Sequence, residues 1–150
     1  WDLDDGNTYN NENITHYYQI TGEYNIKLIV KDSENNTAED NILVNIIDDI
    51  SPTIEIKKPT NSLYILNKSI VNIFKPIVIG QIDIILEVND NFQVNNVLIF
   101  INEQEKENIK NPPYVWTWDE FGFGKYTIKA YVFDKAGNQA NQTIDVSKFF

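Results

Sequence analysis

The sequence contains no cysteine and no methionine, and its only histidine is His16. The absence of cysteine excludes disulfides, thiolate metal sites and cysteine nucleophiles. With one histidine and few serines, the chain offers no set of nucleophile, base and orienting group, so we expect no enzymatic activity. The chain begins at Trp1 rather than at a methionine, and we expect it to be a fragment of a longer protein.

Long apolar stretches and glycine-rich phosphate loops are missing as well. The longest apolar run, Val97–Ile101, has five residues, whereas a membrane-spanning helix needs about 20. We therefore expect no membrane insertion by this segment. The net charge of −10 disfavours nucleic acids and anionic membranes as partners, but it is compatible with divalent cations. We expect no organic cofactor.

Alternation of apolar and polar residues is the dominant pattern of the chain. A period of two residues is typical of half-buried strands. It occurs in segments 24–30, 54–56, 82–88, 114–118, 126–132 and 144–146. Turn-forming clusters separate these segments, and no window has a helical period. We interpret the charged segment Glu103–Glu107 as a hairpin loop. The pattern predicts an all-β protein.

One stretch of the sequence occurs twice. Gly22–Ala38 returns without a gap as Gly124–Ala140, 102 positions later, and the register continues into Ile42/Ile144 and Val44/Val146. A spacing near 100 residues corresponds to one β-sandwich domain. The sequence therefore predicts tandem immunoglobulin-like β-sandwiches: residues 1–47, a short acidic linker at 48–52, and residues 53–148.

Residues 1–47 resemble the PKD domain, an immunoglobulin-like module. The similarity is carried by Trp1-Asp2-Leu3-Asp4-Asp5-Gly6, by His16-Tyr17-Tyr18, and by the alternating segment Gly22–Asp32. Leu3 replaces the phenylalanine of the family pattern, and Asp4 replaces a glycine, which would permit positive φ at that place. A whole PKD domain has two strands before this tryptophan. The resemblance therefore implies an incomplete first sandwich with an exposed core face.

Residues 51–148 resemble an immunoglobulin-like domain of exported bacterial and archaeal multidomain proteins. The similarity rests on segments 52–59, 88–101, 113–119 and 124–138. It implies a non-catalytic extracellular or cell-surface module that acts in spacing, adhesion or interaction. Its partners would be neighbouring domains of the same polypeptide, surface proteins or glycans. The alternative is a carbohydrate-binding accessory module of a secreted hydrolase, either a protease or a glycosidase.

Two groups of acidic residues are candidate Ca²⁺ ligands, because Ca²⁺ prefers 6–8 oxygen ligands. One group is Asp2, Asp4 and Asp5; the other is Asp48, Asp49 and Asp90. A complete calcium-loop pattern is absent from the first group, and we favour turn-capping there and a solvated acidic linker for the second. Asp32 and Asp134 each precede an asparagine by four residues, which predicts a hairpin turn closed by the carboxylate.

Trp116 and Trp118 are two residues apart and therefore share one face of a strand. An exposed pair would form a platform for sugar rings, whereas a buried pair would fill the sandwich core, which we favour. Tyr24 and Tyr126 each follow a glycine by two residues and resemble a tyrosine corner. Glycosylation sequons of the type Asn-x-Ser/Thr occur at Asn13, Asn35, Asn67 and Asn141.

Overall fold

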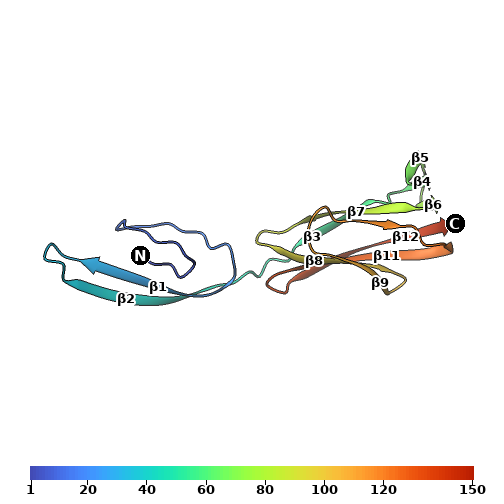
Figure 1. Ribbon diagram of the computed structural model, residues 1–150. Helices are drawn as coiled ribbons and strands as arrows, with labels where there is room; N and C mark the ends of the chain where they lie inside the picture. Colours follow the sequence, from blue (N-terminus) through green and yellow to red (C-terminus); the bar gives the residue numbers. More distant parts are fainter. The chain divides into compact units, whose positions relative to one another are not determined.

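The computed structural model describes residues 1–150, and the chain divides into two compact units, Trp1–Asp49 and Ile50–Phe150 (Figure 1). Every regular element of both units is a β-strand. The structure has no helix long and apolar enough to cross a membrane. The prediction of an all-β chain built from immunoglobulin-like parts is confirmed.

Unit 1 contains a single two-stranded antiparallel sheet. Its strands are β1 (Gly22–Lys31) and β2 (Thr37–Ile46). The preceding segment folds back onto β1 through an isolated bridge between Asp2 and Lys27, which buries Leu3 to 2% exposure. Asp4 has a φ of 61°. Aspartate thus adopts the left-handed conformation at the position where the family pattern has glycine.

Much of the apolar surface of unit 1 is uncovered. The exposed side chains on its two strands are Ile29, Val30, Ile42 and Leu43, each at least half exposed. A two-stranded sheet has no second layer on which to pack these residues. Val30 and Ile42 lie on the face of the sheet that carries Tyr24 and Ile26, whereas Ile29 and Leu43 lie on the opposite face, so apolar side chains are exposed on both faces. The expectation of an incomplete first sandwich is confirmed, and that of an exposed core face stays a prediction.

Unit 2 is a two-layer sandwich. The smaller sheet has the order β10-β7-β3, and the larger one has the order β5-β4-β6-β12-β11-β8-β9. The strands of unit 2 are β3 (Thr53–Lys58), β4 (Ser62–Ile65), β5 (Lys68–Asn72), β6 (Ile77–Ile79), β7 (Ile82–Asn89), β8 (Val94–Ile101), β9 (Gln104–Ile109), β10 (Val115–Trp118), β11 (Phe123–Asp134) and β12 (Gln139–Phe149). Pairing is antiparallel except at β6, which runs parallel to β4 and β12.

The core of unit 2 lies between the two sheets, where alternate residues of facing strands meet. Its buried members are Ile56, Tyr64, Val78, Ile82, Ile84, Leu86, Val97, Ile99, Ile101, Trp118, Ile128, Ala130, Val132 and Val146. β7, β8 and β11 contribute most of these side chains. Their period-two alternation in the sequence is what places one apolar face of each strand inward.

The repeated sequence forms the same hairpin in each unit. Tyr24 pairs with Val44 in β1–β2, and Tyr126 pairs with Val146 in β11–β12. In the turns, Asp32 accepts hydrogen bonds from the backbone amide and the side-chain amide of Asn36 at 2.9 and 2.8 Å. Asp134 accepts the equivalent bonds from Asn138, both at 2.8 Å. The prediction of carboxylate-closed turns is confirmed.

The interpretation of Glu103–Glu107 as a hairpin loop is wrong for most of that segment. Only Asn102 and Glu103 form the turn, and β9 begins at Gln104 as the edge strand beside β8. The apolar–polar alternation missed this strand because most of its side chains are charged. An edge strand tolerates such side chains, since it needs no second apolar face. Charged side chains on an edge also hinder pairing with another chain.

Candidate functional site

The acidic residues near the start of unit 1 are used to shape its loop. Asp2 accepts a hydrogen bond from the backbone amide of Asp4 at 3.1 Å, and Asp5 accepts one from Asn7 at 3.0 Å. Asp4 reaches further along the chain and accepts the backbone amide of Asn25 at 2.9 Å. Each carboxylate thus has a backbone partner, as turn-capping requires.

His16 connects this loop to an aromatic cluster. Its Nε2 lies 2.7 Å from Oδ2 of Asp5, and its Nδ1 lies 3.1 Å from the Tyr9 hydroxyl. Burial alone would raise the pKa of Asp5, but hydrogen bonds from Asn7 and His16 outweigh it and hold that pKa below its ordinary value. Tyr18 packs edge-on against the imidazole ring at 4.8 Å. These contacts give His16 a structural role.

The second group of candidate Ca²⁺ ligands is divided between the two units. Asp48 and Asp49 follow β2 at the end of unit 1, and Asp90 follows β7 in unit 2. Within unit 2, oxygen atoms of Asp90 and Asp134 lie within 4.8 Å of one another. Asp90 accepts a hydrogen bond from the backbone amide of Phe92 at 3.2 Å. Asp134 accepts hydrogen bonds from Asn138 within its own turn. Ca²⁺ binding by Asp48, Asp49 and Asp90 stays a prediction.

The two tryptophans of β10 differ in exposure. Trp118 is 1% exposed and packs edge-on against the Tyr126 ring at 5.1 Å. Trp116 is half-buried and packs against the same core from the edge. A sugar ring stacks only on an accessible aromatic face, and Trp118 presents none to solvent. Both residues lie where the core interpretation places them.

The tyrosine corners and the sequons lie on the strands and turns around these cores. The Tyr24 hydroxyl donates to the Ile20 carbonyl at 2.8 Å, and the Tyr126 hydroxyl accepts from the Phe123 amide at 3.2 Å.

Of the sequons, Asn13 lies in the loop of unit 1, Asn35 in the β1–β2 turn, Asn67 in the β4–β5 turn and Asn141 on β12. Glycosylation at these asparagines stays a prediction.

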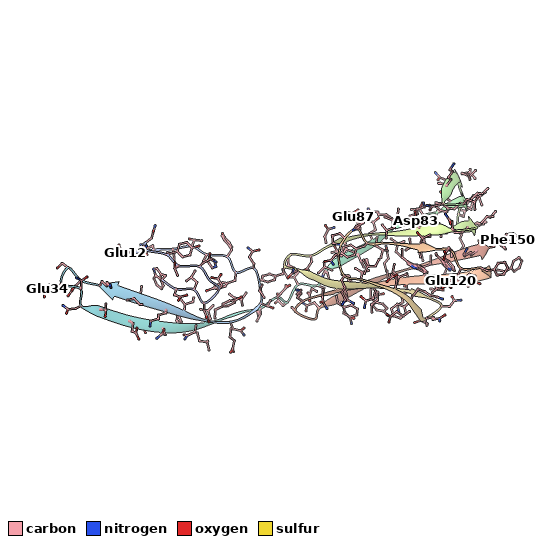
Figure 2. All side chains as sticks on the ribbon, in the orientation of Figure 1. Glu12, Glu34, Asp83, Glu87, Glu120 and Phe150 are labelled. Carbon is pink, nitrogen blue, oxygen red and sulfur yellow. The ribbon has the colours of Figure 1, made fainter.

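A polar cluster that the sequence interpretation missed joins side chains of β3, the β4–β5 turn, β7 and β10. Its Asp83, on β7, is labelled in Figure 2. The Lys58 ammonium donates to both the side-chain and the backbone oxygen of Asn67, the latter at 2.8 Å. The Asn67 amide nitrogen donates to Oδ2 of Asp83 at 2.5 Å, and the Asp83 backbone amide donates to Oδ1 of Asn67 at 2.9 Å. The Thr117 hydroxyl donates to Oδ1 of Asp83 at 2.7 Å.

Electrostatics within this cluster favour an ionised Asp83. Hydrogen bonds from Thr117 and from Asn67, together with the nearby Lys58 charge, lower the pKa of Asp83 against the opposing effect of burial. In the sequence, Asn67 attracts notice only as a sequon, and Lys58 and Asp83 belong to the polar side of strand patterns. The pairing of β3 with β7 brings Lys58 near Asp83, and the Asn67 backbone amide, which donates to the Gln81 carbonyl at 3.0 Å, holds the β4–β5 turn beside the start of β7.

Comparison with known proteins supports the assignment of both units. Residues 1–46 match the PKD domain family. No curated protein matches the sequence. Among solved structures, the fibronectin(III)-like modules of Clostridium thermocellum CbhA are similar, with 16% identity and a TM-score of 0.54. The alignment covers 86% of this chain and 63% of the CbhA chain, so the present chain spans less than two thirds of that structure.

A second similar structure is an engineered protein, with 14% identity and a TM-score of 0.45 over 67% of this chain and 20% of that chain. At these identities the similarities concern the fold alone. The match of residues 1–46 to the PKD family and the fold similarity to the CbhA modules support a PKD unit followed by an immunoglobulin-like sandwich. Modules of these kinds are generally non-catalytic and extracellular, and they act as interaction or spacer domains.

Proposed function

We propose that this chain, a PKD unit followed by an immunoglobulin-like sandwich, is a non-catalytic spacer and interaction module of a larger extracellular or cell-surface protein. The observation that carries the proposal is the path of the chain through unit 2. The chain enters at β3 and leaves at the end of β12, at opposite ends of the sandwich (Figure 1). A domain of this kind transmits tension between its neighbours along the direction of its strands.

The hydrogen-bonding pattern supports this mechanical role. Ladder hydrogen bonds run perpendicular to antiparallel strands, so a pull along the strands loads many of them at once. β12 pairs with β11 over eleven residue pairs, from Phe123–Phe149 to Phe133–Gln139. Its last residues also pair with β6, which runs parallel to it. The C-terminal strand is therefore held on both sides.

Single-molecule force spectroscopy tests the proposal. The chain has no cysteine, so Ile50→Cys and Phe150→Cys give unique handles for pulling along the strands. A matched control uses Phe123→Cys and Phe149→Cys, which are cross-strand partners and peel β11 from β12 one bond at a time. We expect a higher unfolding force from the first pair. An equal or lower force along the strands would contradict a load-bearing spacer.

The carbohydrate-binding alternative has a different signature. A sugar platform on β10 requires tryptophan emission that shifts when polysaccharides are added. Since Trp118 is buried in the core, we expect no saturable shift with soluble cellulose, xylan or chitin fragments. A saturable shift that Trp116→Ala abolishes would support the accessory-module function instead.

A further inference from the structure

The polar cluster of unit 2 combines the groups needed to join two side chains covalently. We propose that Lys58 and Asn67 react within the folded chain to form an intramolecular amide bond, releasing ammonia, with Asp83 as the proton carrier. The inference is independent of the proposed function. It rests on the relative positions of four groups: a nucleophilic amine, a carboxamide, a backbone donor and a carboxylate.

The amine and the carboxamide are held against each other by the fold. Lys58 is the last residue of β3, and Asn67 occupies the β4–β5 turn with a φ of 69°. Because Lys58 Nζ contacts both oxygens of Asn67, it lies beside the atom bonded to Cγ, which is the carbon to be attacked. Fixing both reactants in one chain replaces a bimolecular encounter by an intramolecular one, which is a large rate advantage.

The carbonyl of Asn67 is polarised by the backbone. The Asp83 amide donates to Oδ1 at 2.9 Å, and this is the oxygen on which negative charge develops when an amine adds to Cγ. A backbone N–H aimed at such an oxygen acts as one arm of an oxyanion hole. The flanking residues Ile82 and Ile84 are fully buried, so the strand that carries this donor is fixed in place.

The carboxylate of Asp83 lies beside the nitrogen that would leave. Its Oδ2 accepts from Asn67 Nδ2 at 2.5 Å, while Thr117 orients its other oxygen. Its lowered pKa keeps this group ionised at neutral pH, and as the carboxylate beside both reactants it can carry the proton that Lys58 loses when its nitrogen forms the bond to Cγ. Passing that proton to Nδ2 completes the work of a general acid and base.

The reaction balances without any other reactant. The Lys58 nitrogen forms a bond to Cγ of Asn67, and the bond from Cγ to Nδ2 breaks. Overall, one alkylammonium and one primary amide become one secondary amide and one ammonium ion, so protons and charge are conserved. No oxidant or reductant is consumed. The product links the end of β3 to the β4–β5 turn.

Intact-mass spectrometry of the full chain tests the proposal. Loss of one ammonia lowers the mass by about 17 Da relative to the sequence. We expect this loss in the unmodified sequence after incubation at neutral pH, and its absence in Lys58→Arg and Asp83→Asn. The matched control is Lys57→Arg, since Lys57 pairs with Glu55 and Glu87 outside the cluster. That variant should still lose ammonia.

A second measurement distinguishes the cross-link from a succinimide, which also forms from asparagine with loss of ammonia. Chymotrypsin cleaves after Tyr64, between the two reactants in the sequence. The two resulting peptides stay joined only if Lys58 and Asn67 share an amide bond. The proposal is overturned if the unmodified chain keeps the full mass expected from its sequence. It is also overturned if the Lys58→Arg variant loses ammonia as well. The decisive measurements are made on the unmodified chain, so the test remains valid even if a variant misfolds.

Discussion

Replacing Trp118 by alanine is expected to destabilise unit 2 strongly, because this side chain is a large, fully buried member of the core. It is 1% exposed, its ring contacts Tyr126, and the Lys148 ammonium lies 5.1 Å from its centroid. Truncation of a buried tryptophan costs about 3–5 kcal/mol, from lost burial and from the cavity left behind. Trp116→Ala is the matched control on the same strand.

Trp116 is only half-buried and packs at the edge of the core, so its truncation should cost about 1–2 kcal/mol by area burial. Urea unfolding followed by circular dichroism measures both losses in the full chain. Hydrogen exchange of the β7 and β11 amides assigns the change to unit 2. Equal losses for the two variants, or a loss below about 1 kcal/mol for Trp118→Ala, would refute this account of the core.

Three further predictions concern the charged groups. Burial lowers the pKa of Lys148, whose ordinary value is 10.5, although Asp119 and Glu120 oppose the shift. The folded state therefore binds fewer protons, and stability should rise with pH between the lowered pKa and 10.5. Lys148→Met should remove that rise, as measured by urea midpoints across alkaline pH. Asp134→Ala should destabilise unit 2 by about 1–3 kcal/mol in urea unfolding, because the backbone amides of Gly137 and Asn138 lose their side-chain acceptor, and Asp134→Asn should recover part of the loss. In unit 1, the depressed pKa of Asp5 means that its contribution to stability is present above its ordinary pKa of 3.8 and is lost as pH falls through the folded value. His16→Gln should raise the Asp5 pKa in an NMR titration, and an unchanged value would show that His16 does not contribute to the shift.

The sequence predicted the strands whose two faces differ and the turns whose chemistry is local. The segments around Tyr24, Ile84 and Tyr126 alternate strictly, and the structure places each in a strand. The Asp32 and Asp134 turns depend on groups within four residues, so the sequence contains the whole signal. Because both copies have the same spacing, the two hairpins also share one strand register.

What the sequence could not predict depends on pairings between distant segments. β4, β5 and β6 are short, and β6 joins the larger sheet by parallel pairing with β4 and with β12, whose paired residues are 70 positions away. No local pattern specifies such a partner. The cluster of Lys58, Asn67 and Asp83 is hidden for the same reason: each residue is an ordinary polar position in its own segment.

The two copies of the repeat separate local from tertiary effects within one chain. Val30 and Val132 occupy equivalent positions in hairpins of the same register, yet Val30 is 55% exposed and Val132 is fully buried. The difference comes from the three-stranded sheet β10-β7-β3, which covers the inner face of β11 in unit 2, whereas unit 1 has only β1 and β2. Full burial of a valine contributes roughly 1.5–3 kcal/mol relative to exposure, and several positions of the repeat differ in this way. The same sequence pattern therefore forms a hairpin in both units, while the second sheet provides the burial that the hairpin of unit 1 lacks.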